Sequence, residues 1–369
     1  MHRILKQMRS PISTILKTSK SICFLTTLSV AIAAADISMA GPLHPGRIRP
    51  NRFPPRPQRP YNVSAGDPAA VSLISLMLRA ESTMNVVGTQ VTQVDRNGNV
   101  VQSIQYLTRE GDRALRLDYL QPPNLSGEKV IDDGTNRWRY VPRRNTLQVG
   151  PSTIGKLDGR IHQLMNHLNR PTFVMKIVGA DNVAGHDCQV VEVDSLTTPS
   201  TILRRFWIDP TNGAQLRIEQ YDSAGQLQSV SYFTTITYNA TINSSAFAPP
   251  ATPQGVNVVP RPMTNALSNV QSAEVQAGFS ALQPTYLPTG FTFQSASVMK
   301  YNGYKIIGLK YVNGMNVLSL FETPEHDKPL TNIVHPRPGV AQATISGFRV
   351  ILVGNAAPSD QDQMITSLH

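Results

Sequence analysis

Alternating hydrophobic and polar positions along the chain predict mostly β-strands. The clearest run is residues 203–238, where Leu216 and Ile218 alternate with charged neighbours, which is the two-residue period of a strand with one solvated face. Two turn sequences divide this run, DPTNG at 209–213 and DSAG at 222–225. Pro presets φ and Asn-Gly tolerates a positive φ, so we expect three antiparallel strands joined by tight turns.

Upstream of this meander the same alternation predicts one large curved antiparallel sheet between residues 67 and 247. A helix is expected at 67–83, with Asp67 as N-cap and Pro68 in the first helical position. Val71, Ile74 and Leu78 share one face of it. A second helix is expected at 157–168. Further strands are predicted at 86–94, 100–108, 114–120, 129–132, 137–141, 146–149, 173–178 and 189–193. Together these elements favour a half-barrel sheet with helices inside.

Downstream, prolines concentrated at 249–262 indicate a linker, which we extend over residues 249–272. The remainder, 273–369, predicts a smaller α+β domain. Its expected strands are 293–301, 304–311, 317–322, 342–345 and 348–353. A short helix is expected at 273–282, and a final helix at 359–368 capped by Ser359. The fold class is therefore α+β, with the main domain at 67–248.

The first 40 residues have the pattern of a secretory signal peptide. Basic residues are followed by an apolar run and then by small residues before Gly41. The apolar run is shorter than the roughly 20 residues that a spanning helix needs. We therefore expect export to the periplasm or another extracytoplasmic space. Of the two cysteines, Cys23 lies in this segment, so Cys188 has no partner for an intramolecular disulfide in the mature chain. An inert thiol and a redox role both remain open for it.

Residues 41–66 form a proline-rich arm with five arginines and no acidic residue. The signal segment and this arm carry most of the net charge of +10, so the folded remainder is near neutral and nucleic-acid binding is not expected. The arm is either a solvated spacer or a means of attachment to anionic lipid headgroups. The residues concerned are Arg47, Arg49, Arg52, Arg56 and Arg59.

The chain carries no motif for common enzyme chemistry. Nucleophile-elbow, phosphate-loop, dinucleotide and HExxH patterns do not occur in the sequence. His162 and His167 are five apart on the expected second helix and so face different sides, which argues against a metal site. We therefore expect a protein that is not an enzyme and that holds no cofactor and no metal.

Large apolar side chains recur on the inward faces expected for the main sheet. They form either an ordinary core or the lining of an incompletely filled cavity that admits an acyl chain. The candidates for lipid contact are Trp138, Tyr140, Phe173, Met175, Trp207, Tyr221 and Phe233. On the smaller domain, Tyr301, Tyr304 and Phe321 are predicted to be exposed aromatics that contact a protein partner.

Several segments resemble a known family. DPAA at 67–70, DGTNRWRYVPRRN at 133–145, FWIDPTNGAQLRIEQYDSAGQL at 206–227 and Phe247 resemble the lipoprotein-carrier superfamily of LolA and the RseB/MucB regulators. The smaller domain, with YLPTGF, LKYVNGMNVLSLFE and GFRVILVGNAAPSDQDQMITSL, resembles the C-terminal domain of RseB/MucB. The Arg-rich arm departs from that pattern.

This resemblance implies a periplasmic regulator that binds the extracytoplasmic part of a membrane anti-sigma factor and shields it from proteolysis. The main domain would sense lipid or lipoprotein as a signal of envelope stress. Two alternatives remain: a LolA-type carrier of lipid or lipoprotein, and an envelope scaffold that uses both domains for protein contacts. A carrier would yield transferable lipid in stoichiometric amounts.

Overall fold

In a computed structural model of the protein, two sheets account for most of the described residues. The structure describes residues 66–96, 99–154, 173–195, 202–222, 224–260, 265–301, 304–313, 316–325, 340–354 and 356–369. The predicted signal peptide, the Arg-rich arm before Gly66 and the expected helix 157–168 with its two histidines lie outside these residues.

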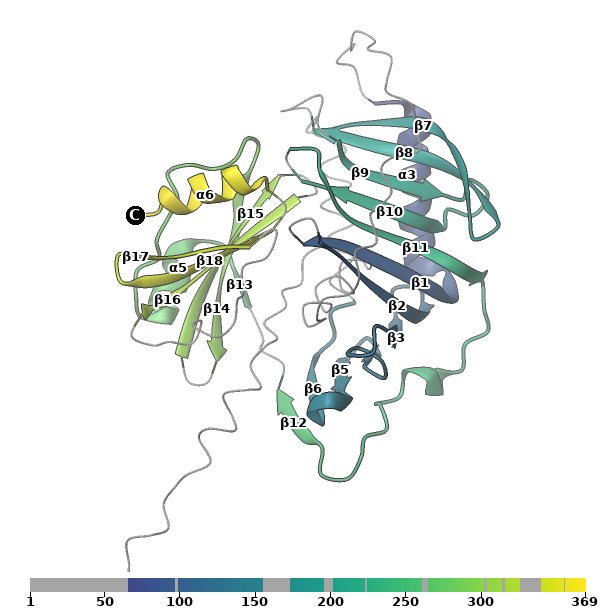
Figure 1. Cartoon of the computed structure of the whole chain (residues 1–369), viewed down its shortest axis with the longest axis horizontal. Helices are drawn as coiled ribbons and strands as arrows, with labels where there is room; N and C mark the ends of the chain where they lie inside the picture. Colours follow the sequence, from purple (N-terminus) through teal and green to yellow (C-terminus); the bar gives the residue numbers. More distant parts are fainter. Residues whose placement is uncertain are drawn as a thin grey trace, which may run out of the picture.

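The larger sheet is open, and it is antiparallel except where β12 pairs with β6 at one edge, which confirms the predicted α+β class. Its strand order is β12-β6-β5-β4-β3-β2-β1-β11-β10-β9-β8-β7, and Figure 1 shows it curving past the helix α3. The first and last long strands, β1 and β11, pair antiparallel in the middle of the sheet. The strands are β1 (Asn85–Arg96), β2 (Asn99–Glu110), β3 (Ala114–Gln121), β4 (Lys129–Asp132), β5 (Asn136–Val141), β6 (Thr146–Pro151), β7 (Phe173–Val183), β8 (His186–Ser195), β9 (Ile202–Ile208), β10 (Gln215–Tyr221), β11 (Leu227–Tyr238) and β12 (Asn257–Pro260).

The turn between β9 and β10 forms as its residues predict. Asp209 accepts hydrogen bonds through its side chain from the backbone N–H of Thr211 at 2.8 Å and from the Asn212 amide at 3.0 Å. Gly213 closes the turn with φ of 82°. Glycine is also required here for space, because a Cβ on Gly213 would lie 2.6 Å from the carbonyl oxygen of Leu76. The turn therefore packs directly on a helix.

That helix, α3 (Pro68–Thr83), begins where the sequence predicts. The side chain of Asp67 accepts a 2.9 Å hydrogen bond from the N–H of Ala69, which satisfies one of the free donors of the first turn. The apolar face of α3 packs on β7 to β10. Ile74, Met77 and Leu78 from the helix join Met175 and Phe206 from the strands in one buried cluster.

The segment expected as a linker, 249–272, contributes strands to both sheets. β12 pairs in parallel with β6, and β13 (Asn265–Leu267) pairs with the first long strand of the smaller sheet. Proline-rich chain can still add an edge strand, because an edge needs only half of its backbone groups bonded. The exact domain bounds stay a prediction.

The smaller sheet has the order β13-β14-β15-β16-β18-β17. Its other strands are β14 (Thr292–Tyr301), β15 (Tyr304–Asn313), β16 (Asn316–Pro324), β17 (Val340–Ile345) and β18 (Phe348–Gly354). The helices α5 (Val270–Ala277) and α6 (Pro358–Thr366) supply Ala273 and Met364 to its core. The prediction that Ser359 caps the final helix is wrong. The N-cap is Ala357, which makes no side-chain bond, and Pro358 takes the first helical position.

Candidate functional site

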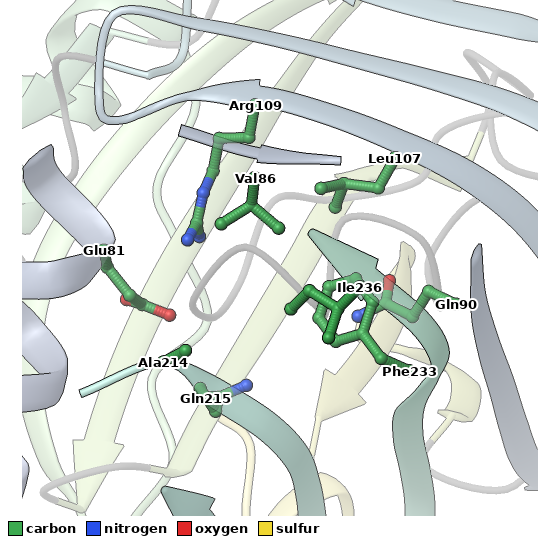
Figure 2. Close-up of a pocket in the computed structure, with 9 residues that line it drawn as sticks. All are labelled: Glu81, Val86, Gln90, Leu107, Arg109, Ala214, Gln215, Phe233 and Ile236. Atoms are coloured by element: carbon green, nitrogen blue, oxygen red, sulfur yellow. The ribbon is translucent and has the colours of Figure 1, made fainter. Parts of the chain in front are cut away.

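A small cavity lies under the C-terminal half of α3, between the helix and the larger sheet (Figure 2). Its apolar lining comes from three strands and from the start of β10: Val86, Leu107, Ala214, Phe233 and Ile236. The cavity volume is about 20 Å³. A water molecule needs roughly 10–15 Å³ measured in this way, so this cavity has space for about one water molecule.

Two opposite charges face each other across this cavity. Glu81 projects from α3 and Arg109 from β2 (Figure 2). Burial raises the pKa of Glu81, and the positive charge of Arg109 partly offsets this. Burial likewise lowers the pKa of Arg109, with Glu81 opposing the change. A buried charge is costly unless it is paired. The attraction between Glu81 and Arg109 therefore offsets part of the free-energy cost of removing each of them from water.

Beside the cavity, part of the interior of the larger sheet is polar, although Val86, Leu107 and Phe233 belong to its main apolar cluster. Gln105 donates to Gln90 at 3.0 Å and to Thr92 at 3.1 Å. The hydroxyl groups of Thr92 and Ser231 lie 2.8 Å apart. These four residues are at most 4% exposed. In the sequence, polar residues that alternate with apolar ones suggest a solvated strand face. Here, hydrogen-bond partners on neighbouring strands allow these polar residues to be buried.

A second buried polar array crosses β7 to β10. The register places Lys176 beside Glu192, Glu192 beside Arg205, and Arg205 beside Glu219. Lys176 lies 3.2 Å from one oxygen of Glu192, and Arg205 lies 2.6 Å from the other. Tyr221 belongs to the same array, because its hydroxyl donates to Glu219. Charges of alternating sign across neighbouring strands stabilise this register.

The seven residues predicted to contact lipid do not converge on one described cavity. Phe233 alone among them lines the cavity under α3. Met175 packs against that helix, Trp138 packs with Ile131 and Phe247, and the Trp207 indole donates a 3.0 Å hydrogen bond to Asp181. Tyr140 is buried on β5. The side chain of Phe173 lies outside the described residues. Their lipid contact stays a prediction.

The three aromatic residues predicted to contact a partner have different environments. Tyr301 and Tyr304 pair at the end of the β14–β15 hairpin, and Tyr304 is 40% exposed. The side chain of Tyr301 is outside the described residues. The expectation that Phe321 is exposed is wrong: it is 6% exposed and packs with Met299, Ile306 and Ile351. These residues cover the opposite face of the smaller sheet from its main core, so β16 is buried on both sides.

Other candidate chemistry is sparse in the described part of the chain. Within it, no group of three His, Cys, Asp or Glu side chains is arranged to hold a metal ion. No helix there is both long and apolar enough to cross a membrane. Cys188 is buried, and burial raises the pKa of its thiol to about 12, with Asp209 and Asp181 adding to the effect. Such a thiol is a weak nucleophile, which favours the inert interpretation.

Comparison with known proteins gives a family and a fold. Residues 69–251 match the model of the MucB/RseB N-terminal domain. Two solved structures, MucB in complex with MucA(peri) and the Pseudomonas aeruginosa MucA/MucB complex, are each 19% identical to this chain, with a TM-score of 0.50. Each match covers 81% of this chain and 98% of that chain. A LolA superfamily protein from Nitrosomonas europaea is 12% identical over 48% of this chain and 97% of its own, with a TM-score of 0.26. A search of curated proteins found no match.

Proposed function

Since residues 69–251 make this chain a member of the MucB/RseB family, we propose that it is a regulator that binds an anti-sigma factor outside the cytoplasm. The proposal assigns it no catalytic step. Export would use the signal-like segment at residues 1–40, and the partner would be the extracytoplasmic part of a membrane anti-sigma factor.

One observation carries the proposal: the likeness to MucB extends over both lobes. The structural match covers 81% of the chain, which is more than the family model's residues 69–251. The smaller sheet is therefore included in a fold shared with MucB, and MucB has been crystallised in complex with MucA(peri). A LolA-type carrier would need only the larger lobe.

A carrier must enclose at least one acyl chain and pass it to an acceptor, whereas a regulator of this kind must bind its protein partner. Native mass spectrometry of the purified protein distinguishes the two functions. Lipid bound in stoichiometric amounts and transferable to an acceptor would support the carrier and the lipid-contact prediction. Protein without lipid would leave partner binding as the function.

The direct test measures cleavage of the partner. The extracytoplasmic segment of the anti-sigma factor encoded in the same genome is incubated with its protease, with and without the full chain. We expect binding and at least a tenfold slower cleavage. If the chain neither binds this segment nor changes its rate of cleavage, the regulator proposal is wrong.

A matched pair of tyrosines tests the predicted contact surface. Tyr304 and Tyr106 are both 40% exposed, but Tyr304 lies on the smaller sheet and Tyr106 on β2 of the larger one. We expect Tyr304→Ser to weaken partner binding about tenfold, as loss of an interface tyrosine commonly does. Tyr106→Ser serves as the control and should leave the affinity unchanged. Equal effects of both substitutions would remove Tyr304 from the proposed surface.

The Arg-rich arm is proposed to attach the protein to anionic lipid. Each arginine near such a surface contributes about 1 kcal/mol, and Arg47, Arg49, Arg52, Arg56 and Arg59 act together without an acidic neighbour. We expect the full chain to bind vesicles containing phosphatidylglycerol at low salt. Deleting residues 41–65 should abolish this binding, and binding that persists after the deletion would show that the arm is a spacer.

A further inference from the structure

Of the described residues, four polar side chains line the cavity under α3, and three of them, other than Gln90, carry buried atoms without a partner. Glu81 comes from α3, Arg109 from β2 and Gln215 from β10, and all three line the cavity (Figure 2). Glu81 is 4% exposed. Its Oε2, the Nε of Arg109 and the Oε1 of Gln215 are buried and have no hydrogen-bond partner among the described residues. Buried polar atoms without partners are rare in folded proteins, and here three of them line one cavity.

The chemistry of these atoms defines the group that would satisfy them. The Nε–H of Arg109 is a donor, whereas the ionised carboxylate of Glu81 and the carbonyl of Gln215 are acceptors. The complement is a neutral group with one acceptor and two donors. A cation would be repelled by Arg109, and an anion would be repelled by Glu81.

The size of the cavity restricts this neutral group to a single water molecule. A volume of about 20 Å³ exceeds the roughly 10–15 Å³ that one water molecule requires but leaves no space for a larger solute. A water molecule donates two hydrogen bonds and accepts others, so it meets the requirement of all three side chains.

We infer that this cavity is a binding site for one internal water molecule, which accepts from Arg109 and donates to Glu81 and Gln215. The water joins the two buried charges, so α3 is connected to the sheet at this point through solvent. At its C-terminal end, α3 is bonded directly to the turn after β2. There the backbone N–H groups of Gly111 and Asp112 donate hydrogen bonds to the carbonyl oxygens of Met84 and Ser82 at 3.2 and 3.1 Å. This site is independent of the proposed partner binding.

A crystal structure of the full chain at a resolution that shows water tests the inference directly. We expect an ordered water within about 2.5–3.2 Å of Glu81 Oε2, Arg109 Nε and Gln215 Oε1. An empty cavity, or a direct ion pair between Glu81 and Arg109 that closes it, would overturn the proposal.

A measurement in solution gives an independent test with a matched control. Oxygen-17 magnetic relaxation dispersion of water counts long-lived internal waters. The double variant Glu81→Met, Arg109→Met should contain one fewer such water than the wild type, because it removes both charged partners. The ion pair of Glu110 and Arg113, whose charged groups lie 2.9 Å apart and whose side chains are 30% and 71% exposed, provides the control. Its replacement by two Met residues should leave the count unchanged. An unchanged number of long-lived internal waters in the Glu81 and Arg109 variant would overturn the inference. If that variant does not fold, the crystal structure of the wild type decides.

Discussion

The backbone N–H of Leu282 donates a 2.7 Å hydrogen bond to Oε2 of Glu322, 40 residues further along the chain. The bond joins the segment after α5 to the C-terminal part of β16. Glu322 is fully buried, and burial raises the pKa of its carboxyl to about 8, an effect that the Leu282 bond opposes and that Glu274 reinforces. Tyr311 faces the same carboxyl, whose charge contributes to the raised pKa of the phenol.

This relationship predicts that the smaller lobe loses stability as the pH rises. The folded pKa of Glu322 lies above the ordinary value of 4.5, so the folded state holds the proton more tightly than the unfolded state. The stabilisation is complete below about pH 4.5 and is lost as the pH rises through about 8. Glu322→Gln keeps the acceptor for Leu282 without the charge. We expect it to match the wild type at pH 5 and to exceed it by a few kcal/mol at pH 9, at about 1.4 kcal/mol per pKa unit.

Urea unfolding followed by circular dichroism at both pH values measures this difference. The exposed Glu325, three residues along the chain, is the control, and Glu325→Gln should keep the pH dependence of the wild type. A wild-type pH dependence in Glu322→Gln would contradict the prediction.

The charge array on β7 to β10 predicts a large cost for losing its central cation. Arg205→Met leaves Glu192 buried with only the longer contact to Lys176 at 3.2 Å. Removing one partner of a buried ion pair costs about 3–5 kcal/mol. Both tryptophans lie in the larger sheet, so tryptophan fluorescence during urea unfolding reports on this lobe. Arg113→Met is the control, because that side chain is 71% exposed, and it should cost at most about 1 kcal/mol. Equal losses would mean that the array contributes no more than a surface pair.

Two glycines with nearly the same φ predict different costs of adding a methyl group. Gly213 and Gly185 have φ of 82° and 83°. A Cβ on Gly213 would lie 2.6 Å from the backbone of Leu76, whereas one on Gly185 would meet nothing within 4 Å. The left-handed conformation alone costs an L-residue roughly 1–2 kcal/mol, which is our expectation for Gly185→Ala. Gly213→Ala should cost more, because the turn must also move away from α3. The same fluorescence measurement checks this, and equal costs would show that the turn moves freely.

The environment of Cys188 predicts an unreactive thiol in the folded protein. Its raised pKa of about 12, against an ordinary value of 9.0, lowers the fraction of thiolate on the order of a thousandfold, since each pKa unit is a factor of ten. Alkylation by iodoacetamide at pH 8, followed by mass spectrometry of the peptide that contains Cys188, should be slow in buffer and rapid in urea. Rapid labelling without urea would support the redox role instead.

Local signals in the sequence predicted the elements well, because their physical causes are local. The Asp67 cap, the turn at 209–213 and the strand alternation each depend on neighbouring residues and appear in the structure. Ser359 was misassigned because Pro358 already fits the first helical position, which moves the cap to Ala357. The short strand β12 inside the expected linker was not predicted, because an edge strand of this kind carries little sequence pattern.

Side-chain environments were predicted less well, because they depend on residues far apart in the chain. Phe321 reads as an exposed aromatic on an alternating strand, yet a second cluster covers that face of the sheet. No local signal in the sequence places Gln90, Thr92 and Gln105 in the interior, where they bond to one another and to Ser231.

By itself, then, the sequence determined the long strands, the tight turns, the helix that begins after Asp67 and the division into a larger and a smaller sheet, since alternation and turn residues act over a few positions. Only the tertiary structure decided which polar groups are buried, because Glu81 of α3 meets Arg109 of β2 and Gln215 of β10 only when the sheet curves beneath the helix. The burial of a charge depends on what folds over it, and that information is not contained in its neighbours along the chain.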